Sequence, residues 1–324
     1  MIVPQNNLTQ ALSERLGGEV RDLTAMKHGM AHRMYSARWQ QSDSTETPIV
    51  IRFFYGTHAA EDARLEDSAL RELARDGYPV PEMFLLVDVD VIDGAPLTIM
   101  SEIPGLPLTQ VAQSKPETIP YWLDKASDLL LRLHGINWHN GYPDFIEALT
   151  PLDFAERQVR WWRAQAEKVG AAEVLTGFNW LRNSFFCTRR AAGQGLVHRD
   201  FHPDNILTDG ERITGVIDWG ELTIADPAVD VGWTRMILST EATIALGDQF
   251  ASDYMRRNPD VAKTLAFWEV FAACKRLTMI ATVRANQSER LAMWSGAPDL
   301  PRLTAVEDAV RAFMHARLTA DECD

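Results

Sequence analysis

A chain of 324 residues is long enough to bury two sizeable cores, and shares of 46% hydrophobic and 24% charged residues are ordinary for a globular protein. The net charge of −13 argues against a general nucleic-acid binder, because phosphate binding needs a basic face. The three cysteines are far apart, so their spacing favours neither a disulfide framework nor a zinc site and fits a reducing cytoplasm. The first residues also lack the basic and apolar regions of a signal peptide.

The first hundred residues read as a small sheet with two helices. An amphipathic helix is expected over 8–16, and the Ala-, Glu- and Leu-rich stretch 59–76 predicts a second helix, which Gly77 would end. Asp93-Gly94 is a hairpin signal between two strands. The runs typical of strands are 20–28, 33–40, 48–54, 83–89 and 96–103.

Beyond Ile103-Pro104-Gly105 the pattern changes to helices. Short β-type runs interrupt it only over 196–217. The apolar stretch 265–283 contains Glu269, Lys275 and Arg276, which favours a buried helix over a membrane span. The helices expected here are 117–134, 151–168, 171–190, 226–239, 241–256, 260–288 and 302–318. The sequence therefore predicts a sheet-rich lobe over 1–102 and a larger, mostly helical lobe over 103–324, with a hinge near 100–105.

Three polar residues stand close together among the β-type runs. His198 to Asn205 reads HRDFHPDN, and Ile217 to Gly220 reads IDWG. Asp200, Asn205 and Asp218 would all lie in loops between strands, where three side chains can point into one cleft. Moving a phosphoryl group from ATP to a hydroxyl needs a carboxylate that orients the acceptor and hard oxygen ligands for Mg²⁺. Asp and Asn also favour turns, so these residues alone leave chemistry and turn formation both open.

These motifs resemble a known family. HRDFHPDN and Asp218-Trp219-Gly220 fit the H-R-D-x-x-x-x-N and D-F-G patterns of protein kinases. The second half of the first motif is similar to the D-x-H-P-x-N loop of the aminoglycoside phosphotransferase and choline kinase-like enzymes. The resemblance covers roughly 20–235, with supporting segments at 64–70, 77–81, 99–105, 130–134 and 226–230.

The resemblance implies an α+β, bilobal protein kinase-like fold. It also implies ATP (possibly GTP), Mg²⁺ and transfer of the γ-phosphoryl group to a hydroxyl of a small molecule, with no nucleic-acid or membrane partner. By position, Asp200 would be the catalytic base, and Asn205 and Asp218 the metal ligands. The nucleotide would be held by the cation Arg52, its partner Glu66, the loop residue Gly29 and the adenine-binding segment Ser101, Glu102 and Ile103.

Two departures from the pattern concern the nucleotide. The cation of the third strand is Arg52 where many kinases carry Lys, so the grip on phosphate would be bidentate. The loop over 27–32 holds the single glycine Gly29 where protein kinases have three, which predicts a looser cover over the phosphates.

Other functions stay open at this point. A protein Ser/Thr kinase would fit HRD and DWG, but only ELTIADPAVD follows Gly220, with no A-P-E and no long activation segment. A catalytically silent nucleotide-binding module would be expected to lack the side-chain oxygens of Asp200, Asn205 or Asp218, and all three residues are present. The acceptor is also open among aminoglycosides, macrolides, choline-like alcohols, homoserine and sugars. Acidic residues that could face ammonium groups of an acceptor are Glu156, Glu167, Glu269 and Asp299.

Overall fold

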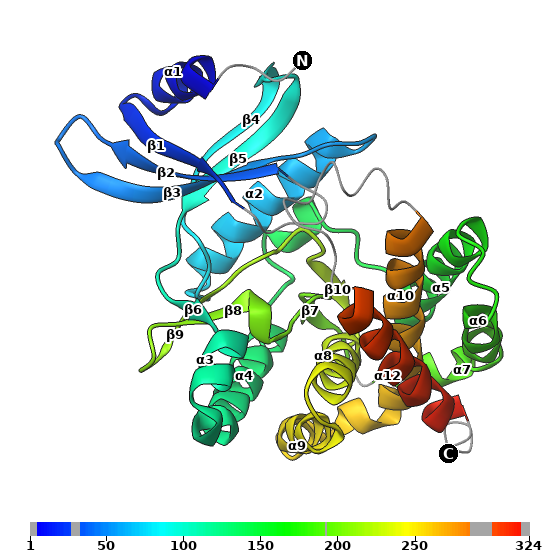
Figure 1. Ribbon diagram of the computed structural model, residues 1–324. Coiled ribbons are helices and arrows are strands. Elements are labelled where there is room, and N and C mark those ends of the chain that lie inside the picture. Colours follow the sequence, from blue (N-terminus) through cyan, green and yellow to red (C-terminus); the bar gives the residue numbers. More distant parts are fainter. Residues whose placement is uncertain (1–4, 27–32, 192, 286–299, 319–324) are drawn as a thin grey trace. The chain divides into compact units, whose positions relative to one another are not determined.

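The computed structural model describes residues 5–26, 33–191, 193–285 and 300–318 (Figure 1). It divides the chain into two compact units. The first consists of Met1–Pro107 and Ile206–Leu222, and the second of Leu108–Asn205 and Thr223–Asp324. The five-stranded sheet lies in the first unit and most of the helices lie in the second.

The first unit is built around an antiparallel sheet in the order β1-β2-β3-β5-β4. Its turn between β4 and β5 is the predicted hairpin, because Asp93 and Gly94 have φ of 54° and 72°, as a type I′ turn requires. The elements are α1 (Gln5–Leu16), β1 (Glu19–Ala25), β2 (Arg33–Gln40), β3 (Glu46–Phe53), α2 (Ala59–Arg75), β4 (Met83–Ile92) and β5 (Ala95–Ser101).

The alternation of side chains along β3 decides where its cation points. Ile49, Ile51 and Phe53 are fully buried and pack in one cluster with Leu8 and Leu12 of α1. Because successive side chains of a strand point to opposite faces, Arg52 lies on the other face of the sheet. That is the face on which α2 packs, so the register of β3 aims Arg52 at α2.

A second, small sheet completes the first unit. Its order is β6-β8-β9, made of β6 (Leu106–Pro107), β8 (Ile206–Thr208) and β9 (Ile213–Val216). Gly105 precedes β6 with φ of +122°, and a Cβ on it would lie 2.3 Å from the carbonyl oxygen of Thr208. Only glycine fits this approach, so Gly105 allows residues 206–222 to join the N-terminal part of the chain.

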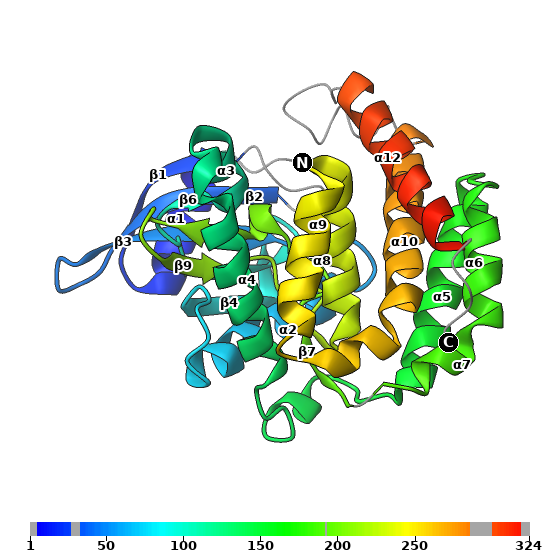
Figure 2. The same cartoon turned by 90° about the horizontal axis from the view of Figure 1, so that it is seen from below.

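The second unit is mostly helical (Figure 2). Its two short strands, β7 (Gly195–Val197) and β10 (Thr223–Ala225), form an antiparallel pair. The HRDFHPDN loop begins directly after β7. The helices are α3 (Leu108–Ser114), α4 (Ile119–His134), α5 (Pro151–Lys168), α6 (Val174–Asn183), α7 (Phe185–Thr188), α8 (Ala228–Glu241), α9 (Ile244–Met255), α10 (Leu265–Ala285) and α12 (Leu300–Leu318).

Most predicted elements are present, and the differences lie at breaks inside apolar runs. The helix expected over 171–190 is two helices, because Ser184 leaves the helical conformation between α6 and α7. The helix expected over 260–288 begins as a 3₁₀ turn, Pro259–Lys263, before α10. Apolar periodicity runs through both breaks and so does not reveal them. None of the helices described is long and apolar enough to cross a membrane.

The cysteines differ from the sequence expectation. Cys187 is disulfide-bonded, whereas Cys274 is free and buried in α10. The wide spacing did not predict this disulfide, because separation along the chain says little about distance in the fold.

Candidate active site

Arg52 is the centre of a buried charge cluster in the first unit. Its Nη1 donates to Oε1 of Glu66 at 2.6 Å, and its Nη2 donates to Oδ1 of Asp218 at 3.0 Å. The other oxygen of Glu66 accepts from the hydroxyl of Thr98 at 2.9 Å. The predicted pairing of Arg52 with Glu66 is therefore present, and the guanidinium also binds a proposed metal ligand.

Burial sets the electrostatics of this cluster. It raises the pKa of Glu66, an effect that Arg52 opposes. Burial alone would lower the pKa of Arg52, but the charges of Glu66 and Asp218 outweigh it and raise that pKa. Removing either partner of such a buried pair leaves an uncompensated charge, which is costly.

Asp218 lies in a tight turn whose neighbour is anchored. The turn gives Asp218 a φ of +67°, which a non-glycine residue rarely adopts. The buried Trp219 donates from its indole to the carbonyl of Val216 at 2.9 Å and packs edge-on against Tyr78. The carboxylate itself stays 46% exposed. The turn thus presents the Asp218 oxygens to solvent while Trp219 fixes the backbone.

The predicted adenine-binding segment directly follows β5. The backbone N–H groups of Ser101 and Glu102 donate to the carbonyls of Glu82 and Pro48 at 2.8 and 2.9 Å. The N–H of Ile103 has no hydrogen-bond partner in the described part of the chain. Of the three predicted residues, Ile103 is therefore the one with a donor left for a nucleotide base. Gly29 lies outside the described residues.

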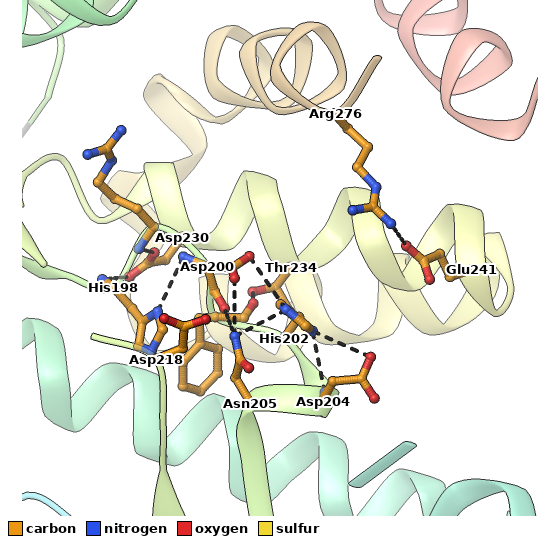
Figure 3. A network of polar contacts seen from close by, with 12 residues as sticks. His198, Asp200, His202, Asp204, Asn205, Asp218, Asp230, Thr234, Glu241 and Arg276 are labelled. Carbon is orange, nitrogen blue, oxygen red and sulfur yellow. Dashed lines mark hydrogen bonds and ion pairs between the residues drawn. The ribbon is translucent and has the colours of Figure 1, made fainter. Parts of the chain in front are cut away.

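The HRDFHPDN loop arranges Asp200 and Asn205 against each other in the second unit (Figure 3). Nδ2 of Asn205 donates to the backbone carbonyl of Asp200 at 2.9 Å and to its Oδ2 at 3.2 Å. These bonds turn the amide nitrogen of Asn205 toward Asp200. Its Oδ1 accepts no hydrogen bond from any described residue and remains available as a hard ligand.

The charge of Asp200 is set by its neighbours. Burial alone would raise its pKa, but His202, whose Nε2 lies 3.5 Å from Oδ1, outweighs burial, and Lys275 and His198 add to that effect. The pKa of Asp200 falls to about 2 as a result. Burial works against the charge of His202 too, yet Asp200 raises the pKa of that imidazole. Asp200 is therefore a carboxylate at neutral pH.

Asp230 at the start of α8 holds the backbone of the loop. Its Oδ2 accepts from the N–H of His198 at 2.8 Å, and its Oδ1 accepts from the N–H of Arg199 at 2.6 Å. His134, at the end of α4, donates from Nε2 to Asp230 at 3.0 Å and accepts from the hydroxyl of Tyr254. Asp230 thus acts as a buried anchor for the backbone of the loop.

Sequence reasoning missed Lys275. This residue of α10 is only 4% exposed, and its Nζ donates to the backbone carbonyl of Arg199 at 3.4 Å. In the sequence, Lys275 is notable only as a charge that argues against a membrane span. A lysine within a largely apolar helix was the available signal, because a buried ammonium needs nearby partners.

The acidic residues considered as acceptor contacts have different environments. Glu269 is buried and paired with Arg235 and Arg317 at 2.5 Å each, so it is already neutralised. Glu156 and Glu167 line a cavity of about 440 Å³ together with three arginines, which does not make that cavity acidic. Asp299 lies outside the described residues. Glu269 is therefore unsuited to bind an ammonium group of an acceptor.

The segment after Asp218 is short. β10 follows at Thr223 and α8 begins at Ala228. An activation segment of the protein-kinase type therefore has no room between Gly220 and α8.

Comparisons with known proteins agree with the motifs. The profile of the phosphotransferase enzyme family matches residues 22–267. Acyl-CoA dehydrogenase family member 10 of Mus musculus is 26% identical over 255 residues, which are 72% of this chain and 22% of that protein. Hygromycin-B 4-O-kinase of Escherichia coli is 30% identical over 128 residues, or 40% of this chain and 35% of that one. The matches thus span well under half the length of these relatives.

A solved structure extends the likeness to the whole chain. A thermostable mutant of aminoglycoside phosphotransferase APH(4)-Ia, in a ternary complex with ADP and hygromycin B, superposes with a TM-score of 0.67 at 18% identity. The match covers 97% of this chain and 99% of that one. It confirms the predicted α+β fold.

Proposed function

Since the chain belongs to the phosphotransferase enzyme family, we propose that it transfers the γ-phosphoryl group of ATP to a hydroxyl of a small molecule. The observation that carries the proposal is the loop geometry. Nδ2 of Asn205 donates to Asp200, so the amide oxygen of Asn205 has no partner among the described residues, and the neighbours of Asp200 keep its pKa low. One group orients an alcohol and the other offers a metal ligand, which are two of the parts that phosphoryl transfer needs.

In the proposed reaction the acceptor oxygen forms a bond to the γ-phosphorus as the bond from phosphorus to the β,γ-bridging oxygen breaks. ADP leaves, and the hydroxyl proton passes to Asp200 and from there to solvent. A carboxylate with a pKa of about 2 is a weak base at neutral pH. Asp200 therefore contributes mainly by accepting a hydrogen bond from the hydroxyl and orienting it. It takes the proton late, as the new bond forms.

The residues suit a Mg·ATP complex by donor type. Asn205 Oδ1 and the exposed carboxylate of Asp218 are the hard oxygen ligands that Mg²⁺ prefers. When bound, the ion would neutralise charge on the phosphates. We assign Arg52 to the phosphates, with Glu66 holding it in place, and the segment Ser101 to Ile103 to the base, with the N–H of Ile103 as its donor. GTP is the alternative nucleotide.

The acceptor is proposed only as a hydroxyl compound. Hygromycin B is the ligand of the superposed enzyme, which makes antibiotics the first acceptors to try. A cytoplasmic location remains part of the proposal, because ATP is the donor.

The test is transfer itself. The protein would be incubated with Mg²⁺ and γ-labelled ATP or GTP against aminoglycosides, macrolides, choline-like alcohols, homoserine and sugars. We expect one class to gain a single phosphoryl group, detected by mass spectrometry, in the wild type and not in Asp200→Asn. Label on a serine or threonine peptide and on none of the small molecules would instead indicate a protein kinase. Binding of Mg·ATP without any transfer would indicate a silent nucleotide-binding module.

A further inference from the structure

Lys275 is enclosed by aromatic rings beside the HRDFHPDN loop. Its Nζ lies 4.7 Å from the ring centroid of Trp233 on α8 and 5.6 Å from that of Trp162 on α5. An ammonium over an indole face is attracted by the ring quadrupole, most strongly when water is excluded. The two rings thus give the buried ammonium of Lys275 favourable contacts inside the helical unit.

The atom that Lys275 binds belongs to a strained residue. Arg199 immediately precedes Asp200 and has a φ of +68°, a strained conformation that a non-glycine residue keeps only where its surroundings impose it. Its surroundings do impose it. Asp230 accepts from its N–H at 2.6 Å, and Gln158 of α5 accepts from its guanidinium at 2.7 Å. The bond from Lys275 to its carbonyl then fixes the other end of the residue, next to the Asp200 peptide.

We propose that Lys275 is a positioning residue for phosphoryl transfer, which holds the Arg199–Asp200 peptide in its strained conformation and so aims the Asp200 carboxylate at the acceptor. The role of Asp200 rests on the proposed function; the hold on the loop does not. Lys275 acts through the backbone and touches neither nucleotide nor acceptor. Asp230 holds the N–H side of Arg199 from α8, and Lys275 holds the carbonyl side from α10.

The charges around Lys275 suit this arrangement. Asp200 lies close enough for the ammonium to favour its carboxylate form. Arg276, the next residue of α10, is paired with Glu241 of α8 (Figure 3). Arg235 of α8 and Arg317 of α12 are paired with Glu269. These neighbouring cations are thus already neutralised by carboxylates, and Lys275 is the cation of α10 that bonds to the loop.

The test uses three variants in the full-length protein. Lys275→Met keeps the length and the packing against the indoles but loses the charge and the donor. Lys275→Arg restores a buried cation that can donate to the same carbonyl. Thr278→Val is the matched control, because Thr278 is a buried polar residue of the same helix whose hydroxyl donates to Cys274 and not to the loop.

Two readouts are measured on each variant. In hydrogen exchange, the peptide over residues 198–205 of Lys275→Met should exchange about 10-fold faster than in the wild type, as loss of a charged hydrogen bond allows. In Mg·ATP turnover with water or a candidate alcohol as acceptor, its kcat should fall about 10- to 100-fold with an unchanged KM for ATP. Lys275→Arg should recover most of both losses, and Thr278→Val should match the wild type in both.

The outcomes separate the two proposals. Wild-type exchange of the loop in Lys275→Met would overturn the positioning role, as would an equal change in Thr278→Val or no recovery in Lys275→Arg. A wild-type protein that transfers phosphate to no acceptor would count against the proposed function. In that case the exchange experiment would still decide whether Lys275 holds the loop.

Discussion

Arg52 and Asp218 are 166 residues apart in the chain, and Nη2 of Arg52 donates to Oδ1 of Asp218 at 3.0 Å. The same guanidinium donates to Glu66 from its other terminal nitrogen. A planar fork can bind two carboxylates in this way, whereas an ammonium is a point charge. The arginine of β3 thus orients the DWG aspartate as well as the α2 carboxylate, which gives a physical reason for an arginine at this position.

Arg52→Ala should lower the free energy of unfolding by about 3–5 kcal/mol, because it leaves the buried carboxylate of Glu66 uncompensated. It should also raise the KM for ATP and lower kcat together. Arg52→Lys should recover only part, since lysine cannot hold both carboxylates. Chemical denaturation and steady-state kinetics measure these effects. Arg64→Ala is the control, because Arg64 makes an exposed pair on α2 with Asp88. Equal stability losses in the two alanine variants would contradict the prediction.

Asp218→Ala should weaken binding of Mg·ATP far more than binding of Mg-free ATP. The reason is that the lost oxygens are proposed to bind the metal and not the nucleotide. Titration calorimetry with and without Mg²⁺ measures both affinities. Asn205→Ala should show a smaller loss of the same kind, because it removes a neutral ligand. If both forms of ATP lose affinity equally in Asp218→Ala, the metal assignment of Asp218 is wrong.

Asp200→Asn should retain nucleotide affinity and lose phosphoryl transfer by about 10²–10⁴-fold, because an amide can neither take the proton nor accept the hydroxyl hydrogen bond as strongly. Nucleotide titration and single-turnover transfer should be measured on the same preparation. Turnover close to that of the wild type would remove Asp200 from the mechanism.

Asp230→Ala should destabilise the loop and the fold together. The backbone N–H groups of His198 and Arg199 would lose their acceptor, at about 1–3 kcal/mol for each buried donor left unsatisfied. Asp248→Ala on α9 is the control, because its pair with Arg235 is half exposed. Denaturation should show a loss in Asp230→Ala that clearly exceeds that of the control, together with a lower kcat. Unchanged stability in Asp230→Ala would show that the anchor is dispensable.

Much of the fold follows from local patterns in the sequence. The apolar run Ile49-Val50-Ile51 predicted β3, and helical spacing predicted α2, which together placed Arg52 and Glu66 on neighbouring elements. Most helices of the second unit were also predicted; α3 was missed, and Ser184 and the 3₁₀ turn before α10 interrupt apolar runs that were predicted as continuous helices. Local periodicity reports which face of an element is buried, so it identifies elements well and their interruptions poorly.

The sequence by itself determined the order and spacing of Asp200, Asn205 and Asp218, and these motifs led to the proposal of phosphoryl transfer, because those residue types suit Mg²⁺ and an alcohol. Only the tertiary structure decided that Arg52 donates a hydrogen bond to Asp218 as well as to Glu66. The same holds for the hydrogen bonds from Asn205 to Asp200 and from Lys275 to Arg199. Each of these depends on the direction of a side chain from one element toward another that is distant in the chain. Those directions are fixed by how the elements pack, which no local pattern encodes.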